Sequence, residues 1–328
     1  MHAAYYERTG PAAEVLTLGE LPDAAPGPGE LRVRLRWSGV NPSDVKSRAG
    51  LRSKTLPFPR IVPHSDGMGV VDAVGEGVDA ARIGQRVWVW NAAWGRANGT
   101  AAQFVVLPAR QAVPLPAGVP DEAGACLGIP ALTALHAVLM AGGVAGQSVL
   151  VAGGAGAVGH YAVQFAKLLG ARTVMATVSS EEKAHIARAA GADLTIDYRR
   201  ENLAERVRAA TGGRGADRIV ELDIAANAAA DLDALRPGGE LVVYGSGRGE
   251  FTLPFFPMIA KNVNLRCFIV YNLEDADRAR AEAVLASMLE RGVLQHAIAQ
   301  RLPLAQIVQA HELVESGRAL GNVVVELP

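Results

Sequence analysis

One short segment constrains the fold more than any other: an apolar run that ends in regularly spaced glycines. Residues 149–152, Val-Leu-Val-Ala, are followed by Gly153, Gly156 and Gly159, and a helical pattern covers residues 157–169. Glycines at this spacing permit a tight turn out of a strand, close backbone approach to a ligand, and close packing of the helix on the sheet. The segment therefore predicts the first strand–turn–helix unit of a parallel, dinucleotide-binding sheet.

The residues around this segment repeat the same alternation from about Ala123 onward. Further apolar strands are predicted at residues 173–177, 218–221 and 240–244, and alanine-rich helical segments separate them. Strands that alternate with helices are typical of a doubly wound α/β domain. Because these strands are almost entirely apolar, we expect helices to cover both faces of the sheet.

The first third of the chain has a different pattern, in which short strands lie between Gly and Pro turns. These strands are predicted at residues 31–37, 67–74 and 86–90. A chain of 328 residues is longer than one hydrophobic core usually grows. We therefore expect a β-rich domain over residues 1–122, a nucleotide-binding domain over 123–264, and an edge strand followed by a return to the first domain over 265–328.

Composition excludes several classes of partner. The formal net charge is −1, so no broad basic surface is available for nucleic acid or anionic lipid, and the expected partner is a small molecule. The apolar runs are too short to span a bilayer, and residues 1–10 lack a secretory signal pattern. The only two cysteines, Cys126 and Cys267, exclude a disulfide framework, which fits a cytoplasmic protein.

The end of the second strand indicates which nicotinamide cofactor is used. Chains that prefer NAD usually place Asp or Glu there, to accept hydrogen bonds from the ribose hydroxyls. Here the strand ends without an acid, and hydroxyl and basic side chains follow instead: Thr177, Ser179, Ser180, Lys183 and Tyr198. Such groups can donate to a 2′-phosphate, so the sequence favours NADPH.

A second interpretation of the same residues stays open. Ser179 can instead be the N-cap of the following helix, with Glu182 as its capping-box partner and Lys183 in solvent. That interpretation does not explain the missing acid.

Four segments together resemble a known superfamily. They are Ser38-Gly-Val-Asn-Pro-Ser-Asp44, Pro63-His-Ser-Asp-Gly-Met-Gly69, Gly128-Ile-Pro-Ala-Leu-Thr133 and the glycine motif, in this order along the chain. The chain resembles the medium-chain dehydrogenase/reductases, and among them the zinc-free quinone oxidoreductase and zeta-crystallin branch. The resemblance implies an α/β protein with a GroES-like catalytic domain formed by both chain ends, an inserted Rossmann domain, and an active site in the cleft.

The resemblance also implies which residues contact the cofactor. They are Asn41, Thr133, Gly153, Ala155, Gly156, Ala157, Val158, Gly159, Thr177, Ser179, Ser180, Lys183, Tyr198, Tyr244, Gly245, Ser246, Gly247, Ile269, Val270, Tyr271 and Asn322.

Zinc-dependent members supply three metal ligands from these same segments, because catalytic zinc needs three protein ligands and an open position. This chain has Asn41, Ser65 and Ile129 there, which do not form a ligand set, so no metal is expected. His64 and Asp66 remain nearby, and a turn histidine paired with a carboxylate or backbone group is the favoured interpretation.

The resemblance implies hydride transfer from NADPH to a quinone or a conjugated carbonyl, with Asn41, Asp44 and Lys46 near the nicotinamide. Many quinone oxidoreductases have Tyr at the position of Lys46, which could stabilise charge on a carbonyl oxygen or could face solvent within a basic run. An enoyl-type reductase, acting on 2-alkenals or acrylates, is the enzymatic alternative. A structural or RNA-binding protein of the zeta-crystallin type is the alternative of another class.

The expected edge strand of the nucleotide-binding sheet indicates how two copies of the protein could associate. Residues 263–270 alternate in apolar character and are expected to form the long edge of the nucleotide-binding sheet. An apolar edge exposes unpaired backbone groups, which a second copy can satisfy across a two-fold axis. We expect a homodimer through the nucleotide-binding domains. The alternative is an edge that a loop or the returning tail covers.

Overall fold

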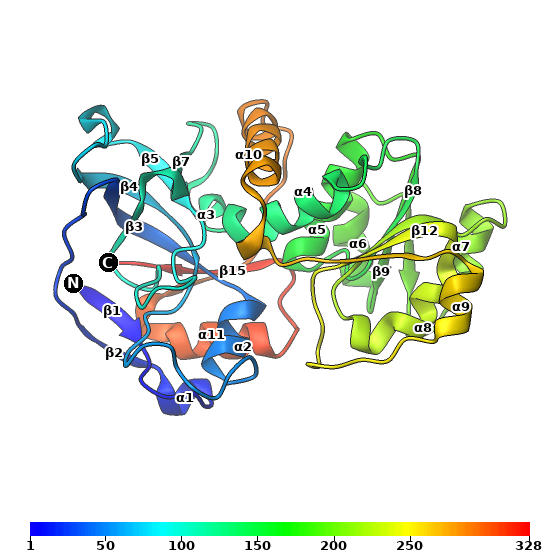
Figure 1. The fold of residues 1–328 in the computed structure, drawn as a ribbon, viewed down its shortest axis with the longest axis horizontal. Helices are drawn as coiled ribbons and strands as arrows, with labels where there is room; N and C mark the ends of the chain where they lie inside the picture. Colours follow the sequence, from blue (N-terminus) through cyan, green and yellow to red (C-terminus); the bar gives the residue numbers. More distant parts are fainter. The chain divides into compact units, whose positions relative to one another are not determined.

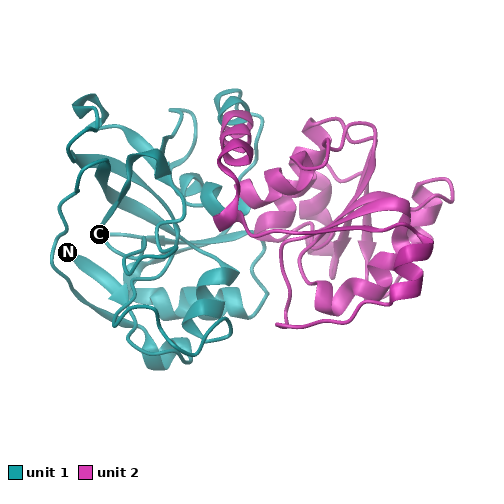
Figure 2. Ribbon diagram, in the orientation of Figure 1, with its two compact units in different colours: residues 1–130, 286–328 teal, residues 131–285 magenta.

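The computed structural model describes residues 1–328 and divides into two compact units. Unit 1 comprises residues 1–130 and 286–328, and unit 2 comprises residues 131–285 (Figure 2). Both boundaries lie farther along the chain than the expected 122/123 and 264/265. The first boundary is later because residues 121–130 contact the sheet of unit 1. The second boundary is later because the last strand of the parallel sheet and the residues after it, up to Leu285, remain in unit 2.

Unit 1 is built on a seven-stranded sheet in the order β14-β15-β3-β4-β5-β7, with β6 also paired to β3, and on a two-stranded sheet of β1 and β2. The strands are β1 (His2–Tyr5), β2 (Thr17–Glu20), β3 (Glu30–Val40), β4 (Asp66–Val74), β5 (Arg86–Val89), β6 (Phe104–Pro108), β7 (Ala112–Pro114), β14 (Ile298–Pro303) and β15 (Asn322–Glu326). The strands predicted at residues 31–37, 67–74 and 86–90 lie within or largely within β3, β4 and β5.

The two ends of the chain meet in this sheet. Strand β15 pairs antiparallel with β3, from Val323 opposite Val40 to Glu326 opposite Trp37, and β14 pairs parallel with β15. The valines of β15 are completely buried or nearly so. Burial of these side chains explains why the tail returns to unit 1, since leaving them exposed would forgo about 1.5–3 kcal/mol for each.

The helices of unit 1 are α1 (Ala12–Val15), α2 (Pro42–Arg48), α3 (Asp121–Gly124) and α11 (Ile307–Glu315), with short 3₁₀ turns η1 (Ala80–Arg82), η2 (Ala109–Gln111) and η5 (Leu304–Gln306). Helices α2 and α11 pack against each other although they lie far apart in the sequence (Figure 1). The buried Arg48 of α2 forms an ion pair with Glu315 of α11.

Unit 2 contains the predicted parallel sheet, in the order β10-β9-β8-β11-β12-β13, and every neighbouring pair is parallel. The strands are β8 (Ser148–Val151), β9 (Thr173–Val178), β10 (Leu194–Asp197), β11 (Ala216–Glu221), β12 (Leu235–Val243) and β13 (Asn264–Cys267). All four residues of β8 are buried, which requires cover on both faces of the sheet. The doubly wound arrangement is therefore confirmed, and β10 is the one strand of this sheet that the sequence pattern did not indicate.

The helices that follow these strands are α4 (Leu132–Leu139), α5 (Ala157–Leu168), α6 (Glu181–Ala189), α7 (Leu203–Ala210), α8 (Ile224–Ala234), α9 (Phe255–Ala260) and α10 (Asp275–Glu290), with a π-helical turn η3 (Leu127–Ala131) before α4 and a 3₁₀ turn η4 (Val270–Asn272) before α10. No helix is long and apolar enough to cross a lipid bilayer.

The completely buried Arg218 of β11 fixes α4 to the sheet. Its guanidinium donates to the carbonyl oxygens of Ala137 (2.9 Å) and Met140 (3.0 Å) at the end of α4. Terminal helix carbonyls lack partners within the helix and carry partial negative charge. A buried cation is stable here because it meets those carbonyls.

The edge strand differs from the prediction. It was expected over residues 263–270, but β13 spans only Asn264–Cys267 before the chain forms η4. Strand β12 ends at Val243, whose carbonyl oxygen accepts from the Phe268 N–H (3.1 Å), so a longer β13 would have no strand beside it.

Candidate functional site

The glycine turn joins β8 to α5, and its geometry explains two of the glycines. Gly153 has a φ of +65°, and a Cβ there would lie 2.5 Å from Leu222 Cδ2. A Cβ on Gly159 would overlap the Gly153 carbonyl oxygen, so only glycine lets α5 approach the turn this closely. A Cβ on Gly156 would meet only that same oxygen, at 3.3 Å. The outer side of the turn is therefore open.

The start of α5 faces this open turn. The helix begins at Ala157 directly after Gly156, whose N–H donates to the Gly153 carbonyl (2.9 Å). The first N–H groups of a helix have no carbonyl partner within it, and the helix dipole places partial positive charge there. The open turn and these donors form a cradle of the kind that binds a pyrophosphate. The predicted contacts Ala155 and Val158 lie in the same segment.

Thr177 supports the turn from the neighbouring strand. Its Oγ1 accepts from the Gly153 N–H (2.9 Å), and its carbonyl oxygen accepts from the Gly154 N–H (3.1 Å). The side chain is almost completely buried. Thr177 was predicted to contact a 2′-phosphate. In the structure its hydroxyl oxygen also binds the glycine turn to β9.

The cap of α6 is Ser180, since its Oγ accepts from the Lys183 N–H (3.3 Å). The open alternative, in which Ser179 is the cap, is therefore wrong. The Ser179 hydroxyl instead accepts from Lys183 Nζ (3.1 Å), which keeps the ammonium beside the end of β9. A hydroxyl and a cation thus lie together where the sequence predicted a phosphate contact.

Arg199 belongs to the same cluster and was not predicted. Its Nη1 donates to the Ser179 carbonyl oxygen (3.4 Å), and its guanidinium lies 6.0 Å from the centre of the Tyr198 ring. Both residues follow β10, the neighbour of β9, and both side chains are exposed. The signal that could have found Arg199 is a basic residue directly after a strand end, but β10 itself was not recognised.

The loop after β12 is tied to the end of β11. The Asp223 carboxylate accepts from the Gly247 N–H (2.6 Å), and a Cβ on Gly245 would overlap the Leu222 carbonyl oxygen. Ser246 Oγ donates to the Arg248 carbonyl oxygen (2.7 Å). The predicted contacts at residues 244–247 therefore form a fixed loop at the same end of the sheet as the glycine turn, because parallel strands share their carboxyl ends.

The remaining predicted contacts of unit 2 lie in two buried places. Thr133 lies in the first turn of α4, and Val270 and Tyr271 lie in η4, all with less than a tenth of their surface exposed. Ile269 directly precedes them and is half-buried.

A buried carboxyl pair lies next to this loop. Glu221, the last residue of β11, accepts through Oε1 from the Asp223 N–H and from Asn227 Nδ2 (2.9 Å). Its Oε2 has no N–H donor, nor does Oδ2 of Asp231 on α8, and the two carboxyls are hydrogen-bonded to each other. Burial raises the pKa of both side chains, that of Asp231 to about 9, so Asp231 is protonated at pH 7 and can donate to Glu221.

In unit 1, Asp66 connects three segments of the chain. Its Oδ2 accepts from Asn41 Nδ2 (3.0 Å) and from the Ile129 N–H (2.9 Å), and its side chain is completely buried. A Cβ on Gly128 would overlap Asp66 Oδ1, so no side chain fits there. Burial raises the pKa of Asp66 well above its usual range.

Asp44 holds Asn41 from the other side. Its Oδ2 accepts from the Asn41 N–H (2.8 Å), which forms part of a capping box at the start of α2. Burial raises the pKa of Asp44 to about 7, while the charge of Arg52 and the hydrogen bond from Asn41 oppose this rise. Lys46 lies in the same helix and is half-buried. The structure thus brings Asn41 and Asp44 together with Asp66.

Asn322 lies beside this group. The pairing of Val323 with Val40 places Asn322 next to Asn41, and Asn322 Nδ2 donates to the Ala297 carbonyl oxygen (3.1 Å). Its amide therefore fixes the start of β15.

The three positions that supply metal ligands in zinc-dependent proteins surround Asp66. Two of them, Asn41 and Ile129, donate to its carboxylate, and Ser65 precedes it in the chain with almost no exposed surface. No group of three His, Cys, Asp or Glu side chains is placed to hold a metal ion.

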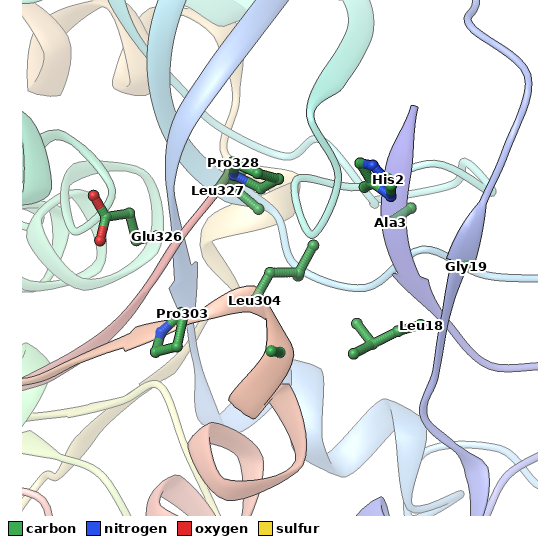
Figure 3. Close-up of a pocket in the computed structure, with 10 residues that line it drawn as sticks. His2, Ala3, Leu18, Gly19, Pro303, Leu304, Glu326, Leu327 and Pro328 are labelled. Carbon is green, nitrogen blue, oxygen red and sulfur yellow. The ribbon is translucent and has the colours of Figure 1, made fainter.

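A pocket of about 520 Å³ lies elsewhere in unit 1 (Figure 3). The N-terminal strands and the C-terminal residues line it, including Leu18, Leu304 and Leu327. None of the predicted site residues is among them, so this pocket does not belong to the candidate site.

Two family models match the chain. The model of the alcohol dehydrogenase GroES-like domain matches residues 27–117, and that of the zinc-binding dehydrogenase matches residues 157–289.

Curated relatives match over almost the whole length. The quinone oxidoreductase of Rattus norvegicus is 30% identical over 325 residues, which are 98% of this chain and 96% of the relative. The 2-haloacrylate reductase of a Burkholderia species is 30% identical over 335 residues, with 99% and 98% covered.

Solved structures are similar over the same extent. An NAD-dependent alcohol dehydrogenase has a TM-score of 0.91 at 33% identity, with both chains fully covered. A mycobacterial protein solved with NADPH has a TM-score of 0.89 at 31% identity, covering 99% of this chain and 100% of that one.

Proposed function

Because the chain belongs to the medium-chain dehydrogenase/reductase superfamily, in its quinone oxidoreductase branch, we propose that it transfers a hydride from NADPH to a quinone or conjugated carbonyl without zinc. The observation that carries the proposal is the glycine turn with Lys183 and Ser179 at the adjacent strand end. The cofactor supplies the hydride when it is bound.

The residues present fit NADPH. The open side of the turn at Gly156 and the N–H groups of α5 would hold the pyrophosphate. Lys183, Ser179 and Arg199 would hold the 2′-phosphate, since two cations and a hydroxyl converge there and no carboxylate follows β9 directly. We assign Asn41, Asp44 and Lys46 to the nicotinamide end, where Asp66 and Asp44 orient Asn41.

A steady-state screen tests the reaction. Purified protein is assayed with NADPH and with NADH against quinones, 2-alkenals, acrylates and saturated aldehydes. We expect turnover of a quinone or a conjugated carbonyl with NADPH, and none of saturated aldehydes, because the chain has no Lewis acid ligand set at residues 41, 65 and 129. Oxidation of NADPH by none of these acceptors would contradict the proposal.

The second candidate is an enoyl-type reductase, which the similarity to a 2-haloacrylate reductase favours. In that case the hydride goes to the β-carbon of the acceptor and a proton to the α-carbon. Transfer from NADPH that carries deuterium at C4 separates the two functions. Deuterium on carbon of a saturated product indicates the enoyl-type reaction, whereas a hydroquinone product indicates quinone reduction.

Zinc independence is tested by metal analysis. We expect full activity after exhaustive chelation, with no stoichiometric zinc, because Asn41, Ser65 and Ile129 offer no thiolate, imidazole or carboxylate. One zinc per chain that is lost together with activity would overturn this part of the proposal.

We also propose a homodimer through unit 2, in a cytoplasmic protein. Strand β13 ends the sheet, and the nearby helix α9 exposes 67% of Phe255, 76% of Phe256 and 50% of Ile259. Apolar side chains this exposed beside a sheet edge are typical of a covered surface. Light scattering at micromolar concentration should give the mass of two chains, and a mass of one chain would contradict the proposal.

A further inference from the structure

A buried series of hydrogen-bonded side chains runs through unit 1, and the proposed reaction does not use it. It begins at His311 of α11, whose Nε2 lies 2.9 Å from Nε2 of His64, and the two rings are inclined by only 25°. His64 Nδ1 lies 2.8 Å from Ser38 Oγ, and Ser38 Oγ lies 2.7 Å from Thr100 Oγ1. All four side chains are completely buried.

The hydrogen bond from Thr100 to the backbone, at the end of this series opposite His311, determines the direction of every hydrogen bond in the series. Thr100 Oγ1 lies 2.6 Å from the Asp66 carbonyl oxygen, and a carbonyl can only accept, so Thr100 donates there. Thr100 has no second proton, so Ser38 must donate to Thr100. Ser38 is then without a proton for His64, so His64 must donate through Nδ1.

Assigning each proton to one hydrogen bond in the same way gives the tautomers of both histidines. Burial lowers the pKa of His64 to about 3 and that of His311 well below its usual range, so both rings are neutral at pH 7. A neutral His64 that is protonated on Nδ1 has a bare Nε2. His311 must therefore carry its proton on Nε2 and donate it to His64, and its Nδ1, which has no partner, is bare.

The chain of donors holds a strained turn. His64 has a φ of +75°, in the left-handed region that residues other than glycine rarely adopt. The Thr100 N–H donates to the His64 carbonyl oxygen (3.0 Å) and its hydroxyl to that of Asp66, so Thr100 spans the turn. Two residues after His64, the Asp66 side chain binds the amide of Asn41.

We propose that His311 is a positioning residue for Asn41: its Nε2 proton satisfies the bare Nε2 of His64, so that His64, Ser38 and Thr100 keep the donor order that holds the turn that carries Asp66. The positioning role rests on the proposed function, in which Asn41 contacts the nicotinamide. The donor order and the tautomers rest on unit 1 alone.

The tautomers are measured first, in protein labelled with ¹⁵N-histidine and without cofactor or acceptor. Long-range ¹H–¹⁵N spectra at pH 7 should show His64 protonated on Nδ1 only and His311 on Nε2 only. Substitution of each histidine in turn assigns its signals among the seven. A His64 protonated on Nε2, or an imidazolium at either position, would overturn the inference. A protein that reduces no acceptor would refute the proposed function and leave this test intact.

Two variants then test the positioning role. His311→Gln keeps an amide N–H donor toward His64, whereas His311→Phe removes it. We expect His311→Phe to mix the His64 tautomers and to lower kcat about ten-fold or more, while His311→Gln keeps the single tautomer and most of the activity. Affinity for 2′,5′-ADP, which probes unit 2, should not change. His185→Gln, at an exposed position of α6, is the control.

Equal kcat values for His311→Phe and the parent protein would overturn the positioning role. So would an equal loss in both variants, because it would show that the ring itself, and not its proton, matters. If His311→Phe does not fold, His311→Gln and the tautomers of the parent protein still test the inference. A mixture of His64 tautomers in His311→Gln would contradict the donor order.

Discussion

Replacing Asp231 with Asn should make the protein more stable, by an amount that grows with pH. In the parent protein the buried Asp231 carboxyl is protonated at neutral pH and interacts with the buried carboxyl of Glu221. An Asn side chain has nearly the same shape, and its Nδ2 can donate to Glu221 Oε2 without any bound proton. The variant therefore keeps the hydrogen bond and removes the need for the proton.

The magnitude follows from proton linkage. Burial, and secondly the charge of Glu221, raise the pKa of Asp231 to about 9, whereas an Asp in the unfolded chain has a pKa of about 3.9. Between these values the native protein binds one more proton than the unfolded chain. Its free energy of unfolding therefore falls by about 1.4 kcal/mol for each unit that the pH rises. The free energy of unfolding of the parent protein is therefore nearly equal to that of Asp231→Asn at pH 4, and is lower by on the order of 4 kcal/mol at pH 7.

Urea unfolding of both proteins at one protein concentration, from pH 5 to pH 8, measures this difference. Titrating groups other than Glu221 keep the same surroundings in both proteins and cancel. Asp233→Asn removes an exposed carboxylate from the same helix and should show no comparable slope. A difference between Asp231→Asn and the parent protein that stays constant from pH 5 to pH 8 would mean that Asp231 holds no such proton, and would refute the reasoning.

Three further outcomes test the site and the assembly. Lys183→Ala should weaken NADPH binding about ten-fold or more and leave NADH binding unchanged, and Arg199→Ala should act in the same direction. Titration of Trp fluorescence measures the affinity for both cofactors. Equal losses of affinity for NADPH and NADH would contradict the 2′-phosphate contact. Gly159→Ala should lower the free energy of unfolding by about 1–3 kcal/mol, because its Cβ would overlap the Gly153 carbonyl; a variant as stable as the parent in urea unfolding would show that α5 can move. Leu265→Pro should dissociate the dimer by interrupting β13, and a variant that remains dimeric in light scattering would place the interface elsewhere.

The sequence predicted the elements whose signals are local. Residues 149–159 specify a strand by their apolar side chains and a tight turn and helix start by their glycines, and the structure has β8, the turn and α5 there. The strands predicted at residues 31–37, 67–74 and 86–90 likewise lie largely within β3, β4 and β5. Apolar periodicity is a property of neighbouring residues, so it can be read without the fold.

The prediction was less accurate where a neighbour in space decides. Strand β13 is shorter than its apolar pattern because β12 ends beside it, and the end of β12 cannot be inferred from the residues of β13. The cap of α6 is Ser180 because the helix begins at Glu181, and two adjacent serines offer the same capping chemistry, so the sequence pattern did not separate them.

The sequence by itself determined the parallel sheet, the glycine turn, the absence of an acid after β9 and the chemistry of residues 41, 65 and 129. Only the tertiary structure brought His311 to His64 and Asp231 to Glu221, and only it added Arg199 to Lys183. The physical reason is that protonation and tautomer are set by desolvation and by the partner that each polar atom meets. For His311 that partner lies 247 residues away in the chain.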